Sequence, residues 1–426
     1  MRAKAMSLLS GLYEWVDERL PVTYFWKAHL ANYYVPKNFN FWYLFGSLAL
    51  MVLVNQIATG IFLTMHYKPD AMLDASGVPG AFASVEYIMR DVPWGWLLRY
   101  MHSTGASAFF ILIYLHMFRG LMYGSYRTPR ELVWVDGMVI FLALMAEAFF
   151  GYLLPWGQMS FWGAQVIVNM FSSVPLIGPE ISLWLRGDYV VGDATLNRFY
   201  SFHVSIVPMV LTGLVAIHVI ALHEAGSNNP DGVEIRDKVD AKGIPLDGIP
   251  FHPYYTLKDN VGLVLLAMAC SVVIFFMPEF GGYFLESNNF VPANPFQTPA
   301  HIAPVWYFTP YYSVLRSITF PLFGIEAKFW GIVGMGAATV IFLFLPWLDR
   351  SPVKSIRYKG PIFKTALAIF VVCFFTLGYL GLNPPTPTKI LIAQGCSMLY
   401  FAFFLLMPIY SRLDRCKAVP ERVTGR

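Results

Sequence analysis

Eight long apolar runs separated by charged loops constrain this chain more than any other feature. They lie at about 41–65, 96–118, 136–155, 201–222, 260–277, 329–348, 362–381 and 390–410. Each is about long enough to cross the roughly 30 Å hydrocarbon core of a bilayer as an α-helix. Only 13% of the residues are charged, whereas soluble domains carry about 25%. The sequence therefore predicts an all-α integral membrane protein with eight transmembrane helices and a lipid bilayer as a partner.

Basic residues concentrate in alternate loops. The loops at 119–130 and 350–359 and the tail at 412–426 are rich in Arg and Lys, whereas the loops at 68–91 and 180–193 are mainly acidic. Short loops rich in Arg and Lys usually remain in the cytoplasm, and eight is an even number, so both termini are expected there. The net charge of +4 follows from this topology, and nucleic acid is not expected as a partner.

Four histidines occupy two of these runs at matching depths. His102 and His116 lie 14 residues apart, and His203 and His218 lie 15 apart. At about 1.5 Å per residue, each pair spans roughly 21 Å on nearly one helix face. A lone histidine in a membrane helix is more often a buried hydrogen-bonding residue, but two matched pairs suit haem irons, which imidazole commonly ligates. We predict two stacked haems: His102 with His203 near the outer face, and His116 with His218 near the cytoplasm.

The spacing in the fourth run is irregular. On an ideal helix 14 residues return to about −40°, whereas 15 residues reach about +60°. Pro208 lies within the longer interval. We expect a proline kink or a π-bulge to absorb the extra residue.

Small and basic residues near the histidines support the same prediction. Two glycine pairs with a spacing of 14 residues lie on the first and third runs: Gly46 with Gly60, and Gly137 with Gly151. A position without Cβ suits the edge of a flat macrocycle, although it also suits close approach of two helices. Arg99 and Arg119 bracket the histidines of the second run. They are expected to pair with haem propionates, or else to extend to the membrane interface.

With these histidines and four longer motifs, the chain resembles cytochrome b of the respiratory and photosynthetic cytochrome bc complexes. The motifs are GYLLPWGQMSFWGAQV at 151–166, HEAGSNNPDGV at 223–233, FHPYYTLKD at 251–259 and PAHIAPVWYF at 299–308. The expected parts are an interfacial amphipathic segment at 1–40, a di-haem four-helix bundle at 41–225 and a carboxy-terminal four-helix part at 226–426. The last part would contain a cytoplasmic loop at 226–259 and an outer quinol-site loop at 279–320.

The resemblance implies the core subunit of a quinol:cytochrome c oxidoreductase in a bacterial inner membrane. It implies two non-covalent b-type haems, the outer of low and the inner of higher potential, with quinol oxidised near the outer haem and quinone reduced near the inner one. One electron would cross the membrane through the haems and the other would go to a Rieske iron–sulfur protein, contributing to the proton motive force. The implied partners are that Rieske protein and cytochrome c1, in a homodimeric complex.

For the inner quinone site, the residues that match the family motifs are His223, Ser227, Lys258 and Asp259. A histidine and a carboxylate on opposite sides of a quinone can bond its two carbonyls and deliver protons. The alternative is a set of ordinary solvated loop residues. His252 lies nearby and is assigned a structural role only.

For the outer quinol site, the matching residues are Tyr152, Gly163, Pro304, Trp306 and Tyr307. Gly163 would leave space for the quinone ring near a short helix after the third run. A helix-cap or packing role is the alternative for each of them.

The chain departs from the family pattern at Val305. The usual motif there is Pro-Glu-Trp-Tyr, and its glutamate is commonly assigned as the acceptor of a quinol proton. Glu147 lies inside the third run, four residues before Gly151 and on the same helix face. Because an ionisable residue inside a membrane helix is costly and usually functional, we expect Glu147 to replace the missing glutamate. Glu286 is the second candidate, and an incidental glutamate in a water-filled cavity is the alternative.

Three other classes of protein share some of these features. A di-haem anchor of a dehydrogenase or hydrogenase needs neither eight spans nor an outer quinol site. The plastid-type complex shares the 15-residue spacing but divides the two parts between separate chains. A secondary transporter explains broken helices and a glutamate within the membrane, but not the matched histidines and glycines.

Overall fold

The eight predicted spans are present as helices. A computed structural model describes residues 2–425, with the side chains of residues 10–28 and 30–425. The segments long and apolar enough to cross a membrane are Phe41–Thr64, Gly95–Tyr123, Glu131–Leu153, Asp193–Ala225, Phe251–Phe276, Ala327–Leu348, Pro361–Leu382 and Pro387–Leu405. The predicted all-α membrane fold is confirmed. The fourth and fifth helices start eight or nine residues earlier than predicted, because polar residues continue both helices beyond their apolar runs.

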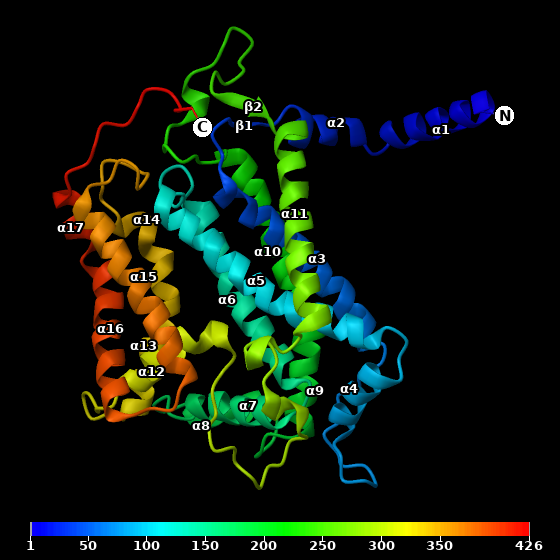
Figure 1. Cartoon of the computed structure of the whole chain (residues 1–426), viewed down its shortest axis with the longest axis vertical. Coiled ribbons are helices and arrows are strands. Elements are labelled where there is room, and N and C mark those ends of the chain that lie inside the picture. Colours follow the sequence, from blue (N-terminus) through cyan, green and yellow to red (C-terminus); the bar gives the residue numbers. More distant parts are fainter. Residues whose placement is uncertain (1, 426) are drawn as a thin grey trace.

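Four of the spans form one bundle (Figure 1). Its helices are α3 (Leu44–Thr64), α5 (Gly95–Tyr123), α6 (Glu131–Leu153) and the continuous series α9 (Asp193–Ser201), η3 (Phe202–Ile206) and α10 (Val207–Ala225). Helix α3 packs along α5, and α6 packs along α10. The fifth span, α11 (Phe251–Phe276), packs against α3 and α5 although it lies beyond the expected boundary at residue 226.

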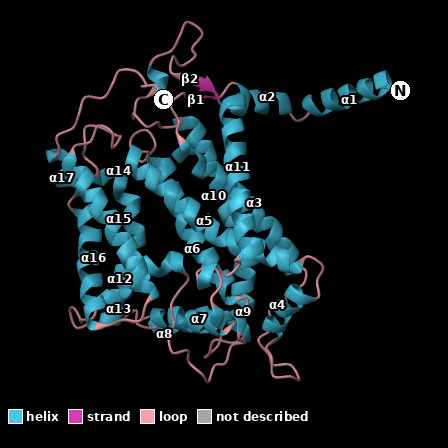
Figure 2. Cartoon of the chain, in the orientation of Figure 1, coloured by secondary structure: helices cyan, strands magenta, loops and turns pink. Residues whose placement is uncertain are grey.

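The remaining spans form a second bundle at the other side of the molecule (Figure 2). Its helices are α12 (Thr309–Ser317), α13 (Ala327–Val340), α14 (Leu345–Leu348), α15 (Pro361–Leu382), α16 (Pro387–Leu405) and α17 (Met407–Leu413). The short helix α12 packs against α13, α15 and α16. Edge-on and tilted aromatic rings pack in the core, among them Phe342, Phe370, Tyr400 and Phe404.

Short elements cover the two ends of the bundles. Helices α4 (Gly80–Arg90), α7 (Gln158–Phe171) and α8 (Gly178–Arg186) lie at the end opposite both termini (Figure 1). At the terminal end lie α1 (Arg2–Asp17), α2 (Val22–Trp26) and an antiparallel pair of strands, β1 (Tyr34–Pro36) and β2 (Gly248–Pro250). The two ends therefore differ: one carries the termini, and the other carries the loops that precede and follow α7.

A buried cluster around Asp349 joins the two bundles at the terminal end. Nζ of Lys359 lies 2.6 Å from Oδ2 of Asp349, and both side chains are fully buried. The same carboxylate accepts a hydrogen bond from Tyr126 at 2.7 Å and lies 3.4 Å from Arg127, both in the loop after α5. This cluster ties the loop of the first bundle to the segment between α14 and α15.

Candidate functional site

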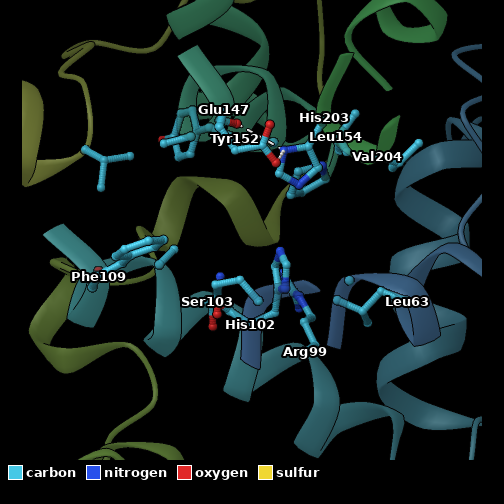
Figure 3. A pocket seen from close by; sticks show the side chains of 18 of the residues that line it. Leu63, Arg99, His102, Ser103, Phe109, Glu147, Tyr152, Leu154, His203 and Val204 are labelled. Atoms are coloured by element: carbon cyan, nitrogen blue, oxygen red, sulfur yellow. Dashed lines mark hydrogen bonds and ion pairs between the residues drawn. The ribbon is translucent and has the colours of Figure 1, made fainter. Parts of the chain in front are cut away.

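The four histidines meet in two pairs inside the first bundle. The ring centres of His102 and His203 lie 6.1 Å apart, and those of His116 and His218 lie 6.5 Å apart. For a metal ion between two imidazoles, with about 2.0 Å to each nitrogen, ring centres about 6 Å apart are expected. Figure 3 shows His102 and His203 facing each other from different helices. Both pairs therefore leave the space that a haem iron held by two imidazoles would require.

A π-helical segment explains the 15-residue spacing on the fourth span. The segment η3 covers Phe202–Ile206 and so includes His203 itself. A π-turn adds one residue without changing the face that follows. The predicted distortion of this helix is confirmed, and it ends two residues before Pro208.

Each of the four glycines lies against one histidine ring. A Cβ atom at Gly151 would overlap the ring of His203. At the other three positions the Cβ would lie 2.9 Å (Gly46 to His116), 3.4 Å (Gly60 to His102) and 3.0 Å (Gly137 to His218) from Cε1 of the ring. All four glycines therefore face an imidazole, and a side chain at Gly46, Gly137 or Gly151 would displace the ring that it meets.

The Nδ1 atom of every one of these histidines has a polar neighbour. The neighbours are the Thr59 hydroxyl for His102 (2.9 Å), the Arg119 guanidinium for His116 (3.2 Å), the Glu147 carbonyl and carboxylate for His203 (3.0 and 2.9 Å) and the Asp136 carboxylate for His218 (3.2 Å). Nδ1–H of His102 and of His203 can donate to these acceptors, which leaves Nε2 of both rings for a metal. The Arg119 guanidinium is itself a donor, and Nδ1 of His218 lies near the carboxylate without a hydrogen bond among the described residues.

The two arginines lie beside the histidine pairs. Arg99 is in the wall of the outer cavity, with its guanidinium 6.0 Å from the Phe290 ring centre. Arg119 lies 5.0 Å from the ring centre of Tyr43, and its Nε is buried without a hydrogen-bond partner among the described residues. A buried N–H group of this kind fits a carboxylate such as a haem propionate.

One cavity joins the His102–His203 pair to the expected quinol residues. It has a volume of about 400 Å³ and a mainly apolar wall. The wall includes Gly60, Arg99, His102, Glu147, Gly151, Tyr152, His203, Glu286, Val305 and Tyr307 (Figure 3 labels several of them). A small apolar molecule in this cavity would lie beside the outer histidine pair.

Other expected outer-site residues stand directly behind this wall. A Cβ atom at Gly163 would lie 3.6 Å from the Tyr152 ring. Trp306 donates a hydrogen bond at 3.2 Å to Ser107, which belongs to the wall. Pro304 precedes Val305, whose buried side chain faces the cavity.

The two candidate carboxylates of the cavity have different surroundings. Glu147 lies against the ring of His203. Glu286 lies beside Tyr152 and accepts a long hydrogen bond of 3.5 Å from Asn289. Burial raises the pKa of Glu286 to about 7. Burial, followed by the nearby charge of Glu286, also raises the pKa of Tyr307. Glu286 is therefore the carboxylate that lies beside Tyr152 of the quinol motifs.

The expected inner-site residues lie at the terminal end of the bundle. His223 packs its ring against Tyr33 with centres 4.4 Å apart, and the Tyr33 hydroxyl lies 3.5 Å from Ser227. Lys258 lies over the Tyr255 ring at 4.5 Å. Asp259 interacts with Ser47 of α3. Tyr33 thus brings two of the four residues together, while the other two lie on α11.

Comparison with known proteins identifies the family. Residues 30–226 match the family model described as Cytochrome b/b6/petB, and residues 292–401 match that described as Cytochrome b(C-terminal)/b6/petD. The chain belongs to the cytochrome b family. It is therefore a membrane protein of electron transport, as the sequence motifs indicated.

Relatives and a solved structure agree over nearly the whole chain. Cytochrome b of Allochromatium vinosum is 61% identical over 96% of this chain and 98% of its own length. The cytochrome b/c1 protein of Bradyrhizobium diazoefficiens is 44% identical over 96% of this chain but only 56% of its own length. One chain of a hyperthermophilic respiratory Complex III is 40% identical, with a TM-score of 0.84, and the match covers 94% of this chain and 98% of that one.

Three residues of the site were not predicted from the sequence. Asp136 lies one residue before Gly137, at the start of the third apolar run, and its charge was an available signal. Thr59 lies one residue before Gly60, and a single hydroxyl in a membrane helix is not a specific signal of a site. Tyr33 belongs to the aromatic segment before the first run. Its contact with His223, nearly two hundred residues later, depends on the folded arrangement.

Proposed function

We propose that this cytochrome b is the core subunit of a quinol:cytochrome c oxidoreductase and holds two non-covalent b-type haems. The proposal rests on the two histidine pairs. The ring centres are 6.1 Å apart in one pair and 6.5 Å apart in the other, and each pair takes one histidine from each of two helices. His102 and His203 would hold the outer haem, and His116 and His218 the inner one. When bound, the haems would supply a path for one electron across the membrane.

The four glycines and two arginines would complete both haem sites. Gly46, Gly60, Gly137 and Gly151 leave the histidine rings free to lie close to α3 and α6. Arg99 and Arg119 would bind propionates, which is supported by the buried, unpartnered Nε of Arg119.

Quinol oxidation is proposed for the cavity beside the outer histidine pair. Its apolar wall suits a quinone ring, and Tyr152 and Tyr307 lie on it. Gly163, Pro304 and Trp306 would hold that wall in place from behind. A quinol hydroxyl would release its proton to a carboxylate, which works best when its pKa lies near the working pH.

Glu286 is the better candidate for that carboxylate. Glu147 was the first candidate from sequence, but its Oε1 lies 2.9 Å from the ring of His203. Glu286 contacts Tyr152 and has a pKa raised by burial to about 7. We therefore assign the role of the missing glutamate at Val305 to Glu286.

Quinone reduction is proposed for the opposite end of the bundle. His223 and Ser227 meet at Tyr33, while Lys258 and Asp259 lie on the adjoining α11. There His223 would donate a hydrogen bond to one quinone carbonyl. Asp259 would bond the other carbonyl and deliver protons to it. This end carries the basic loops, which favours the cytoplasmic side of a bacterial inner membrane for it and for both termini.

The proposed partners are a Rieske iron–sulfur protein and cytochrome c1 in a homodimeric complex. The similarity to a chain of a respiratory Complex III supports this assembly. The cytochrome b/c1 relative, much longer than this chain, supports cytochrome c1 in particular.

A redox-titrated visible spectrum with a pyridine haemochrome assay tests the proposal. We expect two b haems per chain with two separate midpoint potentials. One haem or none would contradict it, and a complete absence of haem bands would favour the transporter alternative.

A further inference from the structure

Helix α6 presents a carboxylate to each of the two histidines on the fourth span. Oε1 of Glu147 lies 2.9 Å from Nδ1 of His203. Oδ2 of Asp136 lies 3.2 Å from Nδ1 of His218. The two acids lie 11 residues apart, which is about three helical turns, so both project from one face of α6.

Both carboxylates are withdrawn from solvent. The side chain of Asp136 is 8% exposed and that of Glu147 is 16% exposed. Oε2 of Glu147 and Oδ2 of Asp136 are buried without a hydrogen-bond partner among the described residues, so Asp136 acts on His218 through its charge and not through a hydrogen bond. Burying a carboxylate is costly unless something compensates it. The group that both acids approach is a histidine ring, and no Lys or Arg appears with either acid among the ion pairs of the described residues.

The two histidines on α5 have different neighbours. His102 meets the neutral hydroxyl of Thr59, and His116 meets the cationic guanidinium of Arg119. Each histidine pair therefore contains one imidazole with a carboxylate at Nδ1 and one without. The negative charge comes from α6 in both cases.

We propose that Glu147 and Asp136 are positioning residues that lower the reduction potentials of the outer and the inner haem, respectively. This inference rests on the proposed function of the four histidines as haem ligands. A carboxylate beside Nδ1–H makes the imidazole a stronger donor to a metal. Its negative charge also stabilises the more positive, oxidised iron, an effect that is strong where water is excluded. Each acid acts through its own histidine, so each tunes one haem.

The experiment is a redox titration of the purified, haem-loaded complex, followed by its visible spectrum and by the EPR g values of the oxidised haems. Glu147→Gln should raise one of the two midpoint potentials, and Asp136→Asn should raise the other. Glu131→Gln is the matched control, because it removes a carboxylate from the first turn of the same helix, where the side chain contacts Thr128. It should leave both potentials and all g values unchanged.

The outcomes separate this inference from the proposed function. Fewer than two haems in the unaltered complex would contradict the proposed function. Two haems in every variant with unchanged potentials, or variants that move both potentials together, would overturn the role of the carboxylates alone.

A variant that loses haem is also informative. If Glu147→Gln lacks only the outer haem, and Glu147→Asp retains both haems with only the outer potential raised, the carboxylate both holds His203 and lowers that potential, which supports the inference. If Glu147→Asp fails as Glu147→Gln does, or if both haems are lost together, the residue acts through general packing and the inference is wrong.

Discussion

Gly137 lies so close to the ring of His218 that a Cβ atom there would stand 3.0 Å from Cε1. The inner imidazole therefore rests on the backbone of α6, and its position depends on the absence of one methyl group. Gly213 on α10 is the opposite case, because a Cβ atom there would meet nothing within 4 Å.

We predict that Gly137→Val displaces His218 and lowers the content of the inner haem. Overpacking a well-filled site typically costs about 1–3 kcal/mol, enough to reduce haem occupancy several-fold or more. Pyridine haemochrome and the redox titration measure this loss. The control Gly213→Val should retain both haems. An unchanged inner haem in Gly137→Val would mean that the ring is not held against this glycine.

Glu286 should control the pH dependence of quinol oxidation. Its pKa is raised by burial to about 7, so it accepts a proton only above that pH, and the rate should rise as the pH passes through about 7. Glu286→Gln should remove this rise of the rate with pH. It should also lower the rate by about a hundredfold, which is the lower end of the rate enhancement that a general base provides.

The matched control for Glu286 is Glu279→Gln, an exposed carboxylate in the same loop. It should keep both the rate and the pH profile. If Glu286→Gln retains the wild-type profile while Glu147→Gln loses it, the proton acceptor is Glu147, as the sequence first suggested.

The raised pKa of Glu286 also affects the stability of the folded protein. Because the folded state raises the pKa of Glu286 above its ordinary 4.5, the folded protein binds this proton more tightly than the unfolded chain does. The contribution is fully present below about pH 4.5 and is lost as the pH rises through about 7. Thermal unfolding in detergent should show that this part of the pH dependence disappears in Glu286→Gln.

The elements that sequence analysis predicted correctly depend on properties of single helices. Membrane spans follow from apolar length, and the facing histidines follow from the helical repeat. Even the distortion at His203 was predictable, since the 15-residue spacing cannot fit an ideal helix.

The features that the sequence did not predict depend on contacts between distant segments. Glu147 was placed on the correct helix face, but its proximity to the ring of His203 requires the packing of α6 on α10. Glu286 belongs to an irregular loop, and no periodicity indicates that this loop covers the outer cavity. The contact between Tyr33 and His223 likewise joins the segment before the first span to the end of the fourth.

The buried pair of Lys359 and Asp349 should be important for stability. Breaking a buried ion pair by removing one partner typically costs about 3–5 kcal/mol, because the remaining charge stays buried. We therefore expect Asp349→Asn to lower the thermal unfolding temperature of the purified protein markedly. Arg90→Gln, which breaks an exposed pair with Glu86, should change it very little.

Tyr33 should affect only the inner quinone site. Its ring packs on His223 with centres 4.4 Å apart, and its hydroxyl lies 3.5 Å from Ser227. An aromatic pair of this kind contributes about 0.5–1.5 kcal/mol, so Tyr33→Leu should slow reoxidation of the inner haem by quinone about two- to tenfold. Flash or stopped-flow spectroscopy separates this step from reduction of the outer haem. Because the outer cavity lies at the other end of the bundle, that reduction should keep its rate. Tyr24→Leu, at an exposed position of α2, is the control. Equal slowing of both steps in Tyr33→Leu would indicate a general loss of structure and not a role in the inner site.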